Sequence, residues 1–168
     1  MNQEAKFQIL MNVKDMYRFL MRHAYIGISG VINLIISGGA FVLYLMGAGG
    51  NSKVSNGMLL IVAALFTIIN PIYLYYKAAK QVKLTPMFLK PLDYKINDPG
   101  VFVSQGEEKL SIEWEQIRKV IETKKDFYIY LSPTRAYILP KEQYEDKVEV
   151  VKDLIRKHVA DKHCKLRN

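Results

Sequence analysis

The side chains that most often perform enzyme chemistry are scarce in this chain of 168 residues. Its histidines are His23, His158 and His163, and its one cysteine is Cys164. A nucleophile needs a base and an orienting third group that converge on it in space. His23 stands at the edge of a long apolar run, and the other two histidines lie near the end of the chain. The sequence therefore predicts no catalytic site, and we expect a protein that is not an enzyme.

A metal site is the other chemistry that His158, His163 and Cys164 suggest. Structural zinc sites need two pairs of ligands, and here no second pair accompanies the first, so a solvated helix end is the better interpretation. We also find no glycine-rich phosphate-binding loop. The segment GAGG at 47–50 lacks the Lys-Ser/Thr that completes a P-loop. We expect neither a metal nor a cofactor. A single cysteine also excludes an intrachain disulfide.

The densest group of aromatic residues lies in the segment FYIYLSPTRAYILP, residues 127–140. Apolar residues alternate there with tyrosines on either side of a Ser-Pro-Thr turn, which is typical of a β-hairpin with one buried face. Packing in a core explains most of these rings. If the face that carries Tyr128 and Tyr130 is outward, however, these tyrosines and Arg135 form a surface for a partner or for the lipid interface.

Basic residues give the chain a formal net charge of +8. Lys77, Lys80 and Lys83 follow a long apolar run and suit a helix that lies along anionic headgroups, where each lysine contributes about 1 kcal/mol. Their simpler role is to mark the cytoplasmic side of a membrane. Elsewhere the charges are mixed in sign and do not form the basic stripe with stacking aromatics that nucleic-acid binding requires, so we expect no nucleic-acid partner.

Two uncharged apolar runs, residues 24–46 and 58–76, occupy most of the first half of the chain. Roughly 20 apolar residues span a bilayer as a helix. A loop at 47–57 joins the runs, and basic residues precede the first run and follow the second, which marks both flanks as cytoplasmic. The first run is too long for a signal peptide and lacks a cleavage site. The sequence predicts a multi-pass protein of the cytoplasmic membrane with both termini in the cytoplasm.

Small and polar residues recur at helical spacing within both runs. Such residues let two helices approach closely and bond across their interface. We expect them to pack the two runs as a hairpin, and a contact between molecules is the alternative use. The absence of intramembrane charge argues against a transporter or channel. The residues are Gly27, Gly30, Asn33 and Ser37 in the first run and Ala63, Thr67 and Asn70 in the second, where Pro71 is expected to add a kink.

After a basic segment at 77–91, the pattern changes to short alternating runs separated by turn residues. An amphipathic helix is predicted at 144–160, with acids at its start and bases at its end. One sheet capped by one helix, together spanning 92–168, is the plan of a pleckstrin-homology-like barrel. Strands are predicted at 92–97, 101–104, 110–114, 127–132 and 136–139, while 117–123 suits either a strand or a helical turn.

The N-terminal stretch KFQILMNV, residues 6–13, also alternates like a strand. An isolated strand is not stable in water, and the predicted topology places this stretch on the same side of the membrane as the sheet. We therefore expect it to join the C-terminal sheet as an extra edge strand. An amphipathic helix at 15–22 then leads into the first apolar run, within an N-terminal segment that ends at residue 23.

In its full length the chain resembles the YcxB-like family of small bacterial membrane proteins. The resemblance rests on the opening strand, KDMYRFLMRH (14–23), the two apolar runs, WEQIRKVIETKKDFYIYLSPTRAYILPKEQY (114–144) and the final helix. It implies a bacterial cytoplasmic-membrane protein with a pleckstrin-homology-like domain, but it implies no reaction and supplies no functional residues.

The predicted fold class is thus an α+β membrane protein: a two-helix transmembrane hairpin plus a pleckstrin-homology-like antiparallel β-barrel or sheet capped by a C-terminal α-helix. We expect a non-enzymatic, membrane-anchored module that binds a protein or peptide partner at the cytoplasmic face, by strand addition at a sheet edge. The alternative is recognition of anionic lipid headgroups by the basic segment at 77–91 and the basic tail.

Overall fold

The computed structural model describes residues 3–167, which divide into two compact units. We call the first the sheet unit; it combines the N-terminal residues up to Asp15 with Val82 onward. The second, the hairpin unit, is Met16–Gln81. The two ends of the chain therefore fold together, although the apolar runs separate them in sequence.

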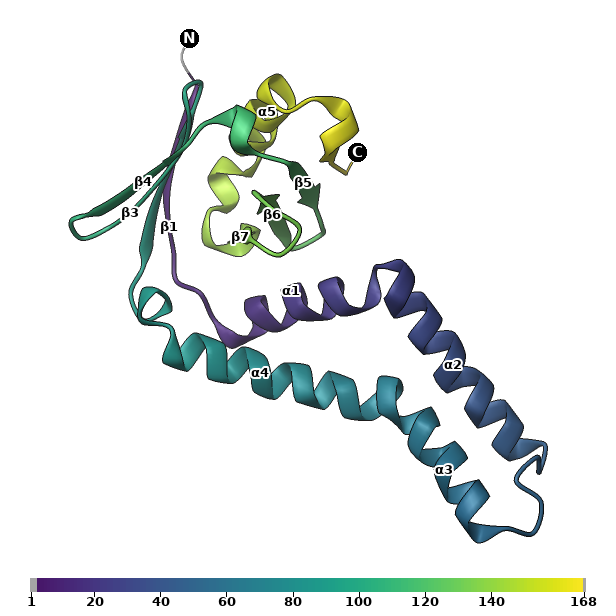
Figure 1. The fold of residues 1–168 in the computed structure, drawn as a ribbon. Helices are drawn as coiled ribbons and strands as arrows, with labels where there is room; N and C mark the ends of the chain where they lie inside the picture. The colour runs from purple at the N-terminus through teal and green to yellow at the C-terminus, as the bar shows by residue number, and fades with distance from the viewer. Residues whose placement is uncertain (1–2, 168) are drawn as a thin grey trace. The chain divides into compact units, whose positions relative to one another are not determined.

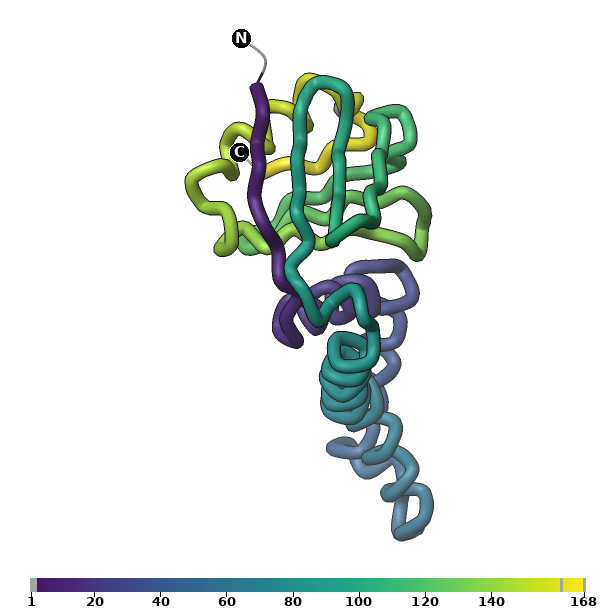
Figure 2. The backbone as a smooth tube through the Cα atoms, turned by 90° about the vertical axis from the view of Figure 1, so that its left-hand side faces the viewer, coloured from purple at the N-terminus to yellow at the C-terminus, as the bar shows by residue number. Residues whose placement is uncertain are grey.

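Sheet A of the sheet unit is antiparallel, with the strand order β1-β2-β3-β4. The expected edge position of the N-terminal strand is confirmed, since Phe7 lies opposite Tyr94 and Ile9 opposite Leu92. Figure 2 shows this purple strand beside the teal strand β2. The four strands are β1 (Glu4–Ile9), β2 (Leu92–Asn97), β3 (Gly100–Gln105) and β4 (Glu108–Ile112).

Sheet B has the order β7-β6-β5-β8, and its β5–β8 pair is parallel. The segment that suited either a strand or a helical turn forms β5. The two sheets are separate and do not close into a barrel, so the barrel part of the prediction needs correction. The strands are β5 (Lys119–Glu122), β6 (Asp126–Tyr130), β7 (Ala136–Pro140) and β8 (Cys164–Lys165).

Helix α5 (Val148–His158) completes the sheet unit (Figure 1). Its buried face, Val151, Leu154 and Ile155, contributes to a single apolar core with residues of both sheets. In that core the ring of Phe7 stacks on Tyr144, with centroids 4.1 Å apart. Short 3-10 turns lie at Pro86–Phe88, Trp114–Gln116, Lys141–Gln143, Glu145–Lys147 and Asp161–His163.

Trp114 lies in one of these turns rather than in the strand predicted at 110–114. The indole Nε1 donates hydrogen bonds to the carbonyl oxygens of Asn97 and Asp98, at 3.1 and 3.0 Å. Strand β4 therefore ends at Ile112, because Trp114 turns inward to cap the β2–β3 turn instead of continuing the alternation.

The hairpin unit holds most of the helical residues. Helix α1 ends at Tyr25, and α2 begins at Ile28, so the bend falls inside the apolar run predicted at 24–46. The second run belongs to a longer continuous helix, Lys53–Leu84. The elements are α1 (Val13–Tyr25), α2 (Ile28–Leu45), α3 (Lys53–Ala64), a π-helical turn η1 (Leu65–Ile69) and α4 (Asn70–Leu84).

The π-helical turn η1 lies directly before Asn70 and Pro71. Pro71 has no N–H to donate to the preceding turn, and π-helical turns are one of the few common causes of helix distortion. The hydroxyl of Tyr25 donates to the carbonyl of Phe66 at 2.7 Å and accepts from Asn70 Nδ2 at 3.0 Å. The Asn70 N–H bonds to the Leu65 carbonyl, five residues earlier. In that register the donor for the Phe66 carbonyl would be residue 71, and Tyr25 supplies the donor that Pro71 lacks.

Two helices, Ile28–Leu45 and Lys53–Leu84, are long and apolar enough to cross a membrane. Only 17% and 6% of their apolar windows are buried within the structure. Helices of a soluble core are mostly buried, so these two helices leave a large apolar surface uncovered.

Candidate functional site

The tyrosine surface predicted in the β6–β7 hairpin is not formed as expected. Tyr128 is only 1% exposed, and its hydroxyl donates to Asp126 Oδ2 at 3.0 Å. Its neighbours in register are Ile121 and Ile138, both buried. Both faces of β6 are therefore buried at this point, and Tyr128 belongs to no open surface. Tyr130 is half-buried and Arg135 is exposed.

The three lysines predicted as a lipid contact lie on α4. Lys77, Lys80 and Lys83 are all exposed, and within residues 3–167 none of them has a carboxylate partner. Their ammonium groups are therefore available to solvent or to an anionic surface.

The residues predicted to pack the hairpin have different environments. Ser37 donates to the carbonyl of Val62 at 3.0 Å across the two helices, and Ala63 beside it is buried. Thr67 instead donates to its own helix, at the Ala63 carbonyl. Asn70 joins the Tyr25 network described above, and Asn33 is half-buried.

The two glycines lie at the bend between α1 and α2 and at the start of α2. Gly27 is exposed, and a Cβ added to it would meet nothing within 4 Å. A Cβ on Gly30 would lie 2.4 Å from the carbonyl oxygen of Ala24. Gly30 is therefore required by the tight bend between α1 and α2.

The feature that sequence reasoning missed is the open edge of β4. Among residues 3–167, β4 pairs only with β3. A two-residue turn at Gly106 and Glu107 joins the strands, with φ of 60° at the glycine, so the flanking pair Gln105–Glu108 is hydrogen-bonded. The bonding then alternates along the ladder, and the backbone N–H and C=O groups of Lys109 and Ser111 point away from β3. These four groups are open to another strand.

The opposite edge of sheet A is partly occupied. Gln143 bonds both the N–H and the C=O of Leu10, at 2.8 and 3.1 Å, immediately after β1. Lys147 Nζ donates to the carbonyl of Lys6 at 2.7 Å. The connection between β7 and α5 thus shields part of the β1 edge, whereas β4 has no such cover in the described structure.

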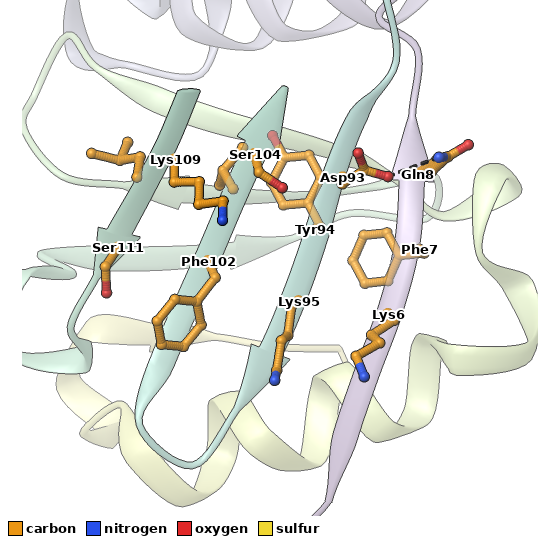
Figure 3. Close-up of a pocket in the computed structure, with 12 residues that line it drawn as sticks. Lys6, Phe7, Gln8, Asp93, Tyr94, Lys95, Phe102, Ser104, Lys109 and Ser111 are labelled. Atoms are coloured by element: carbon orange, nitrogen blue, oxygen red, sulfur yellow. Dashed lines mark hydrogen bonds between the residues drawn. The ribbon is translucent and has the colours of Figure 1, made fainter. Parts of the chain in front are cut away.

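A hollow of about 600 Å³ lies on the outer face of sheet A, opposite the core (Figure 3). Half-buried Phe102 lies on this face with the side chains of Lys6, Lys95 and Lys109. Lys6 and Lys95 both contact Glu4, the latter at 3.0 Å, and they hold the pKa of that carboxyl below its ordinary value. Lys109 has no ion-pair partner among residues 3–167.

A second hollow, about 380 Å³, lies beside the same edge on the inner face. Its apolar lining includes Met87, Val103 and Leu110. Gln105 Nε2 holds the Met87 segment in place by donating to the carbonyls of Met87 and Lys90, each at 3.0 Å. Strand β4 therefore stands between a basic hollow and an apolar one, and Lys109 and Leu110 contribute to both.

One sequence signal was available for this edge. The segment EKLSI of β4 is exposed at four of its five residues, and lysine is a common residue of open edge strands. The predicted strand begins at residue 110 and does not include Lys109.

Among residues 3–167, no group of three or more histidine, cysteine, aspartate or glutamate side chains could hold a metal. His158 stacks on Trp114, with ring centroids 5.0 Å apart, and its Nε2 lies 2.9 Å from Asp98 Oδ1. Its ring therefore packs the end of α5 against the β2–β3 turn.

The comparison with known families supports the sequence-based resemblance. The family model described as YcxB-like protein matches residues 96–154. The match begins in β2 and ends in α5, so it covers β3 to β7 of the sheet unit. No curated protein and no solved structure matches the chain.

Proposed function

We propose that this chain, whose residues 96–154 match the YcxB-like family, is a membrane-anchored, non-enzymatic binding module. Its sheet unit is a pleckstrin-homology-like domain at the cytoplasmic face of a bacterial membrane, and it binds an extended segment of a protein partner at β4.

The membrane part of this proposal rests on the two apolar helices, Ile28–Leu45 and Lys53–Leu84. Ile28, Ile35 and Ile72 are each at least 65% exposed. Apolar surface on this scale marks a membrane or protein contact, and the length of the two helices favours the membrane. The exposed lysines of α4 follow the second apolar run, so they favour a cytoplasmic position for that flank.

The pleckstrin-homology-like assignment rests on the composition of the sheet unit. Two four-stranded sheets and one helix near the C-terminus share one core. Sheet A remains open at its β4 edge, which is the arrangement that strand addition requires.

The single observation that carries the proposed function is the open edge of β4 between two hollows. An added strand gains main-chain hydrogen bonds from Lys109 and Ser111. Because side chains alternate along a strand, its residues would enter the outer and inner hollows in turn. Main-chain bonds provide affinity in this mode of recognition, and the hollows provide selectivity.

The experiment is a selection of linear peptides from a random displayed library against the full chain in nanodiscs of neutral lipid. We expect selected peptides to lose binding to Ser111→Pro, because proline removes an outward N–H without removing a β3–β4 bond. Ser111→Ala is the matched control and should bind normally. Equal binding to the proline variant would overturn the assignment of this edge.

Folding of the proline variant is checked by the fluorescence of Trp114, the chain's one tryptophan. Hydrogen exchange gives an independent measure, since a bound strand should slow exchange at the amides of Lys109 and Ser111 in the wild-type protein. Unchanged exchange with a bound peptide would also contradict the proposal.

Recognition of anionic lipid headgroups is the alternative, and the exposed, unpaired Lys77, Lys80 and Lys83 favour it. Such binding depends on screened charges and should weaken steeply with salt. Native mass spectrometry would support it if the wild type retained anionic lipid that the triple Lys→Gln variant lost. Strand addition should instead survive high salt.

A further inference from the structure

We infer that the segment bound at β4 is acidic at the positions that face the outer hollow and apolar at the positions between them. This inference rests on the proposed function, and it specifies the chemistry of the partner at the same site.

The register of β4 decides which side chain of the partner meets which hollow. Lys109 and Ser111 project to the outer face, where Ser104 and Phe102 are their respective neighbours in register. Leu110 projects to the inner face. Residues that lie directly opposite in an antiparallel pair place their Cβ atoms about 5 Å apart. The partner residue opposite Lys109 therefore lies on the outer face, and the next one enters the inner hollow.

The charge of Lys109 determines which type of partner residue is favoured on the outer face. Glu4 already neutralises one of the two lysines that contact it, and Asp93 accepts a hydrogen bond from Gln8 Nε2 at 2.7 Å. Lys109, the lysine nearest the open edge, has no such partner in the described part of the chain. A carboxylate opposite Lys109 would complete a cross-strand ion pair, whereas a basic residue there would be repelled.

The exposed apolar surface of the inner hollow determines which type of partner residue is favoured there. Leu110 is 43% exposed and Met87 is 47% exposed, although both line the inner hollow beside buried Leu92 and Val103. An apolar side chain inserted there would cover both residues. A lysine or glutamate in the same place would be desolvated without a partner, which is costly.

A second copy of this chain is a poorer occupant of the edge. If two β4 strands paired antiparallel through their outward groups about a two-fold axis, and both partners lay within the strand (Glu108–Ile112), Lys109 would lie opposite Lys109 or Ser111 of the other copy. Neither arrangement supplies a carboxylate on the outer face.

The test uses two synthetic peptides, one alternating glutamate with valine and one alternating lysine with valine, and measures their affinity for the full chain in neutral nanodiscs. We expect the acidic peptide to bind more tightly, by roughly five-fold or more. Lys109→Glu should reverse the preference. The control Lys124→Glu makes the same charge change at an exposed loop lysine, and it should leave the preference intact.

The outcomes separate this inference from the proposed function. If both peptides bind equally and Ser111→Pro abolishes both, the edge is correct and the acidic preference is wrong. A preference that Lys109→Glu and Lys124→Glu reduce alike would also overturn the inference, since it would then reflect net charge. If neither these peptides nor any selected peptide binds, both this inference and the proposed function fail.

Discussion

Replacing Glu122 with glutamine tests a buried ion cluster that ties the last described residues to sheet B. The side chain of Glu122 is only 4% exposed and contacts the ammonium groups of Lys141 and Lys152, the latter at 3.5 Å. Its second oxygen accepts the backbone N–H of Arg167 at 2.7 Å, and Lys152 also donates to the Arg167 carbonyl at 2.6 Å. One carboxylate thus compensates two lysines and holds the segment after β8.

The expected loss of stability follows from the two lysines that Glu122→Gln leaves without a carboxylate. Removing one partner of a buried ion pair costs about 3–5 kcal/mol, because an uncompensated charge is left behind. The side chains of Lys141 and Lys152 are 16% and 10% exposed, so each keeps some access to water. We therefore take the lower bound, about 3 kcal/mol. For a unit of this size that corresponds to a melting temperature lower by about 12 °C or more.

The assay is thermal unfolding of the full chain in detergent micelles, followed by Trp114 fluorescence. Acid should reproduce part of the effect in the wild type. Burial raises the pKa of Glu122, but Lys141, the Arg167 N–H and Lys152 outweigh it and hold the pKa below its ordinary value of 4.5. This carboxylate stabilises the fold above pH 4.5, and its contribution is lost as pH falls through the lower folded pKa. Glu122→Gln should remove that part of the acid sensitivity.

The matched control is Glu115→Gln, a glutamate of the same unit that is exposed and has no ion-pair partner within residues 3–167. It should change stability by less than about 0.5 kcal/mol. If Glu122→Gln melted within 2 °C of wild type, roughly the effect of the control, the cluster would contribute no net stability and the reasoning would be refuted.

Two further predictions concern backbone geometry. Tyr25→Phe should destabilise the hairpin unit by about 0.6–1.7 kcal/mol, because the Phe66 carbonyl loses its donor. In a Pro71→Ala background the same substitution should cost less stability, since residue 71 then has an N–H to donate. Unfolding of the wild type, the two single variants and the double variant in micelles measures this coupling, and additive effects would contradict it. Gly100→Ala should cost about 1–3 kcal/mol, since its Cβ would lie 2.4 Å from the Ile112 carbonyl oxygen; a wild-type melting temperature would argue that the turn can relax.

The elements of this protein follow from local patterns in its sequence. Alternation predicted β2 and the β6–β7 hairpin, and the burial of Ala5, Phe7 and Ile9 in β1 follows the period of two that such strands require. Length and lack of charge identified the two apolar helices, although not the bend at 26–27. Pro71 indicated a distortion in the second helix. These features depend on neighbouring residues, and so one sequence suffices to predict them.

Features that depend on distant residues required the structure. The sequence predicted that Tyr128 could face outward, but both faces of β6 are buried, and no alternation within one strand can show what covers its second face. Trp114 continues an apolar alternation and yet leaves the strand, because its indole finds two carbonyls about 16 residues earlier in the chain.

The open edge is the clearest case. The sequence by itself indicated that this chain combines two apolar helices with a mixed-charge domain of short strands and one amphipathic helix. It could not determine which strands lie at the edges of the two sheets or which of those edges is uncovered. Strand order is fixed by packing between segments far apart in the chain, as when β1 pairs with β2 across more than eighty residues. Only that order leaves Lys109 and Ser111 with free backbone groups, between a basic hollow and an apolar one.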